Sequence, residues 1–479
     1  MNTLKRFCVV AFLMCFISCD VEVENYSTIP VAGFPSNVDE AEAILIGTYD
    51  RVRDITNNTA YFEDRGDSFD VGIVGGPTDA YSQSLFPGNA PTWTSFYNVL
   101  QNINILIAEV PQFTDGNSKA QRILAEAYYL RAHTYFLMAR IWGDVPLELE
   151  PTTTIGDEFA GRAPVSEVFV QINADIQSAI EMFPVDGIPD KYRASKPAAY
   201  SLLADVKMWT GKVLGGGVAD FNAAVAAIEV VENSGGVSLL SDFGDIFDNK
   251  ANSEIIFALF FDLDEQAGMY ARLVSAKEGD IGNANLDLNP DLPISVGNTS
   301  RHVYSPGTQI RELFSANDLR RDRTFLPILT GNAENPTVRS FHQTKFSGTV
   351  FNAEREYDND IIVYRLGGLL LLKAEALAAL GDITGALVPL NRVRNRADLP
   401  DYSGPMDKAS VEREILDERG RELFLELKRW NDLVRFHYGG TINIYNYVPS
   451  LNGLDIPLYW PISDEVIVLN DNIEQTEGY

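Results

Sequence analysis

The residues best suited to ligand binding are aromatic and lie in two long segments with little helical periodicity, residues 59–92 and about 262–358. Flat aromatic rings stack on the CH-rich faces of sugars, while Asp, Asn and Arg side chains hydrogen-bond to hydroxyl groups. We therefore expect ligand contacts from Tyr61, Arg65, Asp67, Phe69, Tyr81, Phe86, Tyr270, Tyr304 and Phe341. For any single one of these residues, local packing is the commoner role.

Catalytic chemistry has little support. The four histidines, His133, His302, His342 and His437, show no metal-ligand spacing, and no HExxH, GxSxG or P-loop pattern is present. We therefore expect no metal and no cofactor. A helical glycoside hydrolase would need only two carboxyl groups about 5–9.5 Å apart, and 67 acidic residues leave that alternative open. A binding protein remains the favoured class.

The N-terminus has the pattern of a bacterial lipoprotein signal. Lys5 and Arg6 precede an apolar run, residues 7–17, and Ser18 then stands before Cys19. The run has the length of a secretory signal, about 7–15 residues, and is shorter than the roughly 20 needed to span a bilayer. We predict a signal peptide over residues 1–18 and lipid attachment at Cys19. The alternative is an ordinary cleaved signal in which Cys19 is incidental.

Composition limits the possible partners and crosslinks. The formal net charge is −29, which repels phosphate backbones and argues against nucleic acid as a partner. All three cysteines lie within the first 19 residues, so no disulfide framework is expected beyond them. An apolar content of 46% is that of an ordinary globular protein.

Helices must position the two loop segments. Apolar residues recur at three or four positions in the ranges 37–55, 93–110, 119–141, 165–182, 196–210 and 220–231. In residues 364–397 two such stretches are joined at Gly381–Asp382, which is typical of helix-pair repeats. We predict a mostly α fold of about four TPR-like helix pairs, over residues 37–57, 93–234 and 361–436. A short β run at 254–261 makes the loop-rich ligand face partly β.

Several conspicuous side chains are better explained by packing than by ligand binding. We expect the five tryptophans, which are Trp93, Trp142, Trp209, Trp430 and Trp460, to belong to the core. In the segment 415–436, Arg419, Glu422, Glu426 and Arg429 fall at helical spacing. We interpret these four charged residues as a structural network that fixes the helix to its neighbours.

Three motifs resemble segments of the SusD/RagB family, in the same order. In chain order they are AEAYYLRAHTYFLMARIWGDVPL at 125–147, ILDERGRELFLELKRWNDLVRF at 415–436, and LYWPISDEVIVLNDNIEQTEGY at 458–479. The motif at 458–479 departs from the family pattern at Ser463, Asp471 and Thr476–Glu477, where the family has prolines or an Asn-Pro pair. These departures affect turns near the end of the chain and leave the resemblance intact.

The resemblance implies a single SusD-like domain over residues 19–479, anchored by lipid on the extracellular face of the outer membrane. It also implies a SusC-like TonB-dependent transporter as partner, to which the protein delivers captured oligosaccharide or polysaccharide without catalytic turnover. In the RagB branch of the family the ligand is a peptide, which is the alternative. A helical glycoside hydrolase is the less favoured third possibility.

Overall fold

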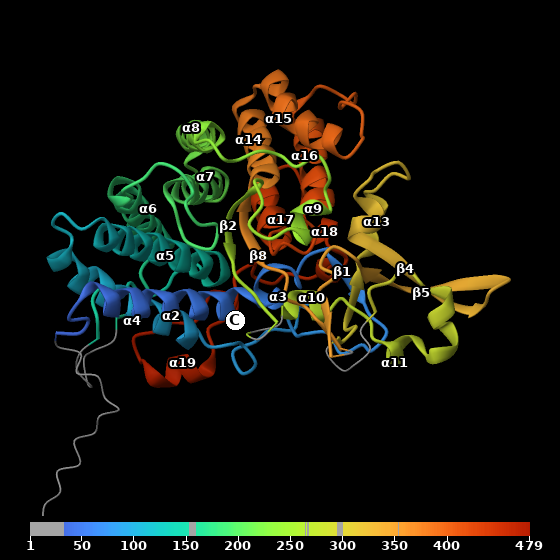
Figure 1. Ribbon diagram of the computed structural model, residues 1–479, viewed down its shortest axis with the longest axis horizontal. Coiled ribbons are helices and arrows are strands. Elements are labelled where there is room, and N and C mark those ends of the chain that lie inside the picture. Colours follow the sequence, from blue (N-terminus) through green and yellow to red (C-terminus); the bar gives the residue numbers. More distant parts are fainter. Residues whose placement is uncertain (1–32, 153–159, 264, 266–267, 295–299, 353) are drawn as a thin grey trace, which may run out of the picture.

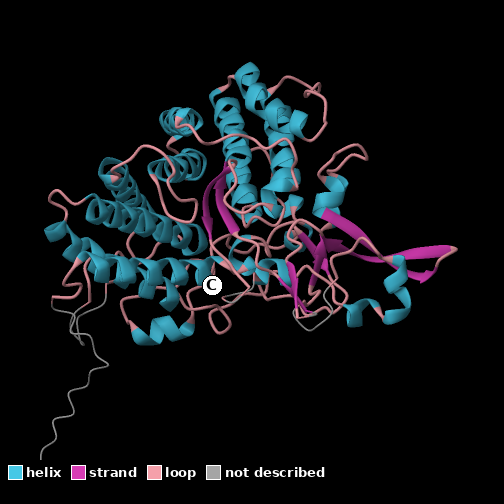
Figure 2. Ribbon diagram, viewed as in Figure 1, coloured by secondary structure: helices cyan, strands magenta, loops and turns pink. Residues whose placement is uncertain are grey.

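The computed structural model describes residues 33–152, 160–263, 265, 268–294, 300–352 and 354–479. The predicted signal peptide and Cys19 lie outside the described residues. Helices dominate the described part, and its strands are few and short (Figure 2). The predicted fold class, mostly α with a loop-rich and partly β region, is confirmed. Within the described residues, every helix is too short or too polar to cross a membrane.

Six long helices form the first part of the chain and pack against one another in sequence order (Figure 1). They are α2 (Val38–Thr56), α4 (Thr94–Glu109), α5 (Ser118–Trp142), α6 (Val165–Met182), α7 (Lys196–Val213) and α8 (Gly217–Asn233). Side chains of Asn37, Asn117 and Ser195 accept hydrogen bonds from the free amides of the first turns. Helix α5 ends where Gly143 takes a φ of 73°. The predicted helical ranges are thus confirmed to within a few residues.

The C-terminal helices are α14 (Leu366–Leu380), α15 (Ile383–Arg396), α16 (Lys408–Leu423), α17 (Arg429–Tyr438), α18 (Ile444–Tyr447) and α19 (Asp464–Leu469). The predicted break between α14 and α15 is confirmed, because Gly381 is left-handed and Asp382 caps α15. The TPR-like repeat itself remains a prediction.

The segment 415–436, whose charged residues were interpreted as lying on one helix, belongs to two helices. The chain breaks between α16 and α17, where Leu425 and Leu427 both have a φ of 61°. Two buried cations favour this break. Lys345 Nζ donates to the carbonyl oxygens of Glu422 (3.1 Å) and Phe424 (2.8 Å), and Arg365 donates to that of Glu422. They satisfy carbonyl groups that a helix end leaves without partners.

The predicted helical range 361–436 also begins too early. Residues Ile361–Arg365 form strand β8, which pairs antiparallel with β2 (Ile255–Leu259). The run Ile-Ile-Val-Tyr favours a strand because branched and aromatic side chains suit a pleated, buried surface. Every residue of both strands is buried, so this small sheet lies inside the helical body.

The loop-rich region contains short helices and hairpins. Its strands are β1 (Phe69–Val71), β3 (Tyr304–Pro306), β4 (Phe325–Asn332), β5 (Asn335–Gln343), β6 (Thr349–Phe351) and β7 (Glu354–Glu356). Its helical turns are α3 (Thr59–Phe62), α9 (Asp245–Asp248), α10 (Met269–Arg272), α11 (Glu278–Ile281), α12 (Thr308–Glu312) and α13 (Arg321–Thr324). The hairpin β4–β5 projects at the opposite end of the molecule from α5 and α6 (Figure 1).

The tryptophans and the charged residues of the segment 415–436 lie as the sequence predicted. All five tryptophans are buried, and they belong to one large apolar cluster that spans the helices. Arg419 pairs with Asp432 at 2.8 Å, and Arg365 pairs with both Glu422 and Glu426. The predicted structural role of the charged residues in 415–436 is confirmed.

Candidate functional site

The two loop segments that the sequence singled out meet at a short antiparallel pair of strands. Strand β1 pairs with β3, with Phe69 opposite Pro306, Asp70 opposite Ser305 and Val71 opposite Tyr304. Alternate side chains of a strand point to opposite faces. Phe69 is buried, and Asp70 on the opposite face is partly accessible; Val71 shares the face of Phe69 but is exposed at the end of the strand.

Tyr304 is the fixed centre of this junction. Its ring stacks on Phe69 with the centroids 4.8 Å apart and the planes 8° from parallel. Its hydroxyl donates to Asp64 Oδ2 at 2.7 Å and accepts from the amide of Thr78 at 3.0 Å. Burial raises the pKa of Tyr304 well above its usual range, so the phenol remains a donor. The side chain is wholly buried and cannot offer a ring face to a ligand.

Tyr81 is the outer ring of the same group. It contacts Tyr304 with the centroids 5.4 Å apart and an interplanar angle of 35°. Tyr81 is only half-buried, so part of the ring reaches solvent. Burial, and then the nearby charge of Asp70, raises the pKa of Tyr81, which keeps its hydroxyl protonated. A ring that packs on a fixed neighbour and is partly exposed to solvent is suited to stacking on a sugar.

Polar groups lie beside this ring. Asp70 Oδ2 accepts from the amide of Thr308 at 2.9 Å and from Arg311 Nη2 at 3.2 Å. The Arg311 guanidinium lies 3.7 Å from the ring centroid of Phe341, and its Nε donates to the carbonyl of Pro306. These residues place a carboxylate and a guanidinium next to accessible rings. We call Asp70, Tyr81, Thr308, Arg311 and Phe341 the loop face. Sequence reasoning missed Arg311, because no motif marks it.

Six of the nine predicted ligand residues are buried, so the prediction that these six contact a ligand at the surface is wrong. Tyr61 packs against Phe96, Trp142 and Trp460, with 5.1 Å between its centroid and that of Trp460. Tyr270 packs edge-on against Phe346. Phe69 and Tyr304 belong to the stack described above. Long segments with only short helices and strands still need a core, and these aromatic side chains supply part of it.

Arg65 and Asp67 are buried in polar networks of the scaffold. Asp67 makes a two-bond ion pair with Arg429, at 2.7 and 2.8 Å. Arg65 stacks on Trp430 and donates to the carbonyl oxygens of Leu458 and Pro457. Both residues therefore tie the first loop to the C-terminal part of the chain.

The remaining predicted residue, Phe86, is 55% exposed. Its ring lies beside Gly88, and the carbonyl of the intervening Pro87 accepts a hydrogen bond from the amide of Asp464, the first residue of α19. Tyr81, Phe86 and Phe341 are thus the predicted aromatics that remain accessible. Their role as ligand contacts is still a prediction.

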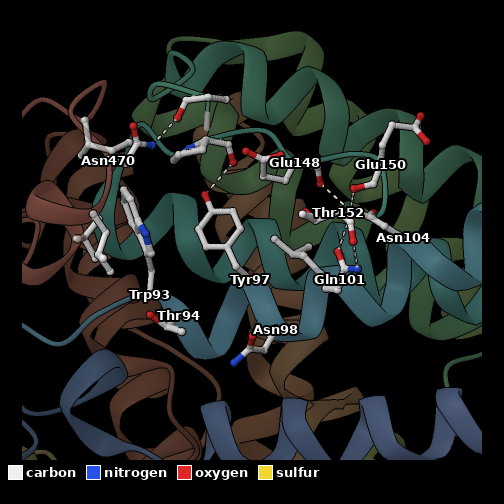
Figure 3. Close-up of a pocket in the computed structure, with 16 residues that line it drawn as sticks. Trp93, Thr94, Tyr97, Asn98, Gln101, Asn104, Glu148, Glu150, Thr152 and Asn470 are labelled. Atoms are coloured by element: carbon white, nitrogen blue, oxygen red, sulfur yellow. Dashed lines mark hydrogen bonds between the residues drawn. The ribbon is translucent and has the colours of Figure 1, made fainter. Parts of the chain in front are cut away.

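A separate cavity of about 360 Å³ lies between α4 and α19 (Figure 3). We call it the apolar slot, because Trp93, Tyr97, Leu100, Val466, Leu469 and Ile473 form most of its wall. Four of the polar side chains around it, those of Tyr97, Gln101, Asn104 and Asn470, hydrogen-bond to the main chain. Tyr97 donates to the carbonyl of Pro146, and Gln101 exchanges two hydrogen bonds with Thr152 (Figure 3). The slot therefore suits an apolar group better than a polyhydroxylated one.

The described residues contain no group of three or more His, Cys, Asp or Glu that could hold a metal ion.

Two family models match the chain. Residues 37–208 match a family described as starch-binding proteins associating with the outer membrane, and residues 329–479 match the SusD family. Together these segments include the long helices from α2 to most of α7 and the C-terminal helices.

Known proteins resemble the chain along most of its length. SusD-like protein P38 of Formosa agariphila is 25% identical over 522 aligned residues, covering 100% of this chain and 99% of the relative. The starch-binding protein SusD of Bacteroides thetaiotaomicron is 23% identical and covers 80% of this chain and 77% of that relative. The structure of NanU from B. fragilis superposes with a TM-score of 0.83 at 26% identity, covering 94% of this chain and 99% of NanU.

Proposed function

The chain belongs to the SusD family, and on this basis we propose that it captures oligosaccharides at the outer membrane and delivers them to a SusC-like TonB-dependent transporter. The description of one matching family as starch-binding, and the name of the starch-binding relative, support a glycan as the ligand. In this proposal the protein binds and releases its ligand without turnover.

The observation that carries the proposal is the arrangement of Tyr81. This ring is accessible, is supported by the buried ring of Tyr304, and has the carboxylate of Asp70 and the guanidinium of Arg311 nearby. Glycan recognition needs a rigid ring for the CH face of the sugar and charged groups for its hydroxyls. Because the rings and the ion pair are held by contacts within the protein, little side-chain entropy is lost on binding.

Anchoring adds to this function. We propose that residues 1–18 are removed and that lipid on Cys19 tethers one domain, residues 19–479, to the extracellular face of the outer membrane. A tether keeps the binding protein near its transporter and raises the effective concentration of captured ligand at the channel.

A binding screen tests the proposal. The purified protein is titrated by calorimetry and run in affinity gels against neutral glucans, fructans, mannans, xylans, alginate and a peptide mixture. We expect binding to one glycan class and no release of new reducing ends during incubation. New reducing ends would instead indicate a glycoside hydrolase. Failure to bind any of the glycans would refute the proposed ligand class.

Peptide capture is the second candidate function, and the apolar slot is the observation that favours it. A slot of about 360 Å³ with aromatic and aliphatic walls can hold an apolar side chain of a peptide. Leu469→Asp would place a carboxylate on its wall, and Leu469 is 76% exposed, so the fold should tolerate the change. Val468→Asp is the matched control, because Val468 is 79% exposed and does not line the slot. Loss of peptide binding in the first variant alone would support this function.

A further inference from the structure

We propose that the protein has a second saccharide-binding site, in a pocket near its C-terminus that is separate from the loop face. The pocket measures about 740 Å³, which is within the range of small-molecule sites. We call it the tyrosine pocket and define it by Tyr438, Tyr445, Tyr459, Arg162, Glu474 and Glu477. The inference rests on the proposed function, since it assigns a neutral glycan as the occupant of a further site.

The walls of the tyrosine pocket come from three parts of the chain. Tyr438 is the last residue of α17, Tyr459 precedes the buried Trp460, and Glu474 and Glu477 belong to the C-terminal segment. Arg162 joins the end of α5 to the C-terminal segment, because its guanidinium donates to the carbonyl oxygens of Trp142, Asp144 and Glu474 at 2.8–3.0 Å.

Buried contacts hold these walls in place. Arg65 fixes the floor from beneath, with Nη1 2.6 Å from the carbonyl oxygen of Leu458. Gln475 exchanges two hydrogen bonds with the main chain of Ile462, at 2.7 and 2.8 Å. Thr476 donates to the carbonyl of Trp460. A pocket fixed in this way needs little rearrangement before it binds.

Gly143 explains how the ring of Tyr459 lies in the pocket. A Cβ atom on Gly143 would lie 3.2–3.4 Å from three carbon atoms of that ring. The absence of a side chain therefore lets the ring lie close against the backbone at the end of α5. The glycine of the Trp-Gly-Asp-Val-Pro segment thus has a role in shaping the pocket as well as in ending the helix.

The pocket offers polar groups that the protein does not use. Among the described residues, the hydroxyls of Tyr438 and Tyr459 and the carboxylates of Glu474 and Glu477 have no hydrogen-bond partner. Burial raises the pKa of Tyr459 to about 12, so its phenol stays protonated and can donate. Hydroxyl-rich ligands satisfy such groups, and the tyrosine rings can stack on the CH faces of the same sugar. The walls of the apolar slot are mainly apolar, whereas those of the tyrosine pocket are mainly polar, which is why we assign the saccharide to the tyrosine pocket.

The charge of the pocket selects a neutral ligand. Three carboxylates, those of Asp144, Glu474 and Glu477, line it together with one cation, Arg162. Because the Arg162 guanidinium is already bonded to main-chain oxygens, it has little capacity left to bind the acid group of a uronic acid. Like charges then disfavour acidic glycans.

Calorimetry of the full chain with short neutral oligosaccharides of glucose, mannose and xylose tests the inference. We compare the wild type with Tyr438→Ala, with Tyr81→Ala at the loop face, and with Phe351→Ala as control. Tyr438 and Phe351 are each 48% exposed, so neither truncation should affect folding. We expect the wild type to bind two oligosaccharides per chain, and Tyr438→Ala to weaken one of them about tenfold or more.

The outcomes separate this inference from the proposed function. One bound oligosaccharide that Tyr81→Ala removes and Tyr438→Ala leaves unchanged would overturn the tyrosine pocket and support the loop face. One bound oligosaccharide that is lost only in Tyr438→Ala would support the tyrosine pocket and refute the loop face. No binding of these oligosaccharides by the wild type would overturn the tyrosine pocket, and no binding of any glycan in the screen would overturn the loop face as well. Glu474→Gln provides a second test, since it removes a charge without changing size and should also weaken binding at the tyrosine pocket.

Discussion

The ion pair between Asp67 and Arg429 gives the sharpest prediction about which predicted ligand residues belong to the scaffold. Both side chains are almost fully buried, at 1% and 3% exposure, and two bonds of 2.7 and 2.8 Å join them. Burial disfavours the charged guanidinium, but the carboxylate of Asp67 outweighs that effect and raises the pKa of Arg429. The guanidinium of Arg429 is therefore charged at neutral pH.

We predict that Asp67→Asn lowers the free energy of unfolding by about 3 kcal/mol. The amide can keep one of the two hydrogen bonds, but the other is lost and the buried guanidinium no longer has a compensating charge. Removing one partner of a buried pair costs about 3–5 kcal/mol, and the retained bond places this change near the lower limit. For a chain of this size the loss corresponds to a fall in Tm of about 3 °C.

Differential scanning calorimetry measures the effect, and the chain offers a matched control. Asp417→Asn makes the same chemical change in an i, i+4 pair whose Arg413 partner is 45% exposed, and it should cost about 0.5 kcal/mol or less. We also expect folded Asp67→Asn protein to bind glycan with wild-type affinity. If Asp67→Asn were as stable as Asp417→Asn and also lost its affinity for glycan, the reasoning would be refuted. Asp67 would then be a ligand-binding residue, as the sequence predicted.

Three further changes test other parts of the structure. Burial raises the pKa of Glu63 to about 7. The stability that its bound proton contributes is therefore full below the ordinary pKa of Glu and is lost as the pH rises through 7. The free energy of unfolding, measured with urea, should fall by up to about 3 kcal/mol between about pH 5 and about pH 8, and Glu63→Gln should reduce this fall. Gly143→Ala should cost about 1–3 kcal/mol, because a φ of 73° strains an L-residue and the Cβ would crowd Tyr459; an unchanged Tm would contradict this. Tyr304→Phe should cost about 1–2 kcal/mol, because Asp64 loses a donor, and equal urea midpoints for the variant and the wild type would count against that role.

The long helices could be predicted from the sequence because the information is local. Helix α5 shows apolar residues at three- and four-residue spacing and a glycine at its end, and its observed bounds, Ser118–Trp142, differ by one residue from the expected range. The break after Leu423 could not be predicted in this way. It depends on Lys345 and Arg365, which are distant in sequence and reach the helix end only in the folded chain.

The loop segments show the same limit for the candidate site. Tyr81 and Tyr304 are both tyrosines in irregular segments, and nothing near either residue in the sequence shows which one is buried. Their difference arises from the pairing of β1 with β3 and from the hydrogen bond to Asp64, contacts across more than 200 residues. Arg311 reaches the loop face through the same long-range pairing, so residue type alone could not identify it.

The most direct test of the central claim, that the loop face captures glycan, is the affinity of Tyr81→Ala for the glycan that the wild type binds. Calorimetry should show the loop-face affinity falling about tenfold or more, because a stacking ring is lost. The variant should stay folded with its Tm lowered by only a few degrees, since the Tyr81 ring is partly exposed. Phe351→Ala should bind as the wild type does. Retention of full affinity and stoichiometry by folded Tyr81→Ala protein would contradict the account.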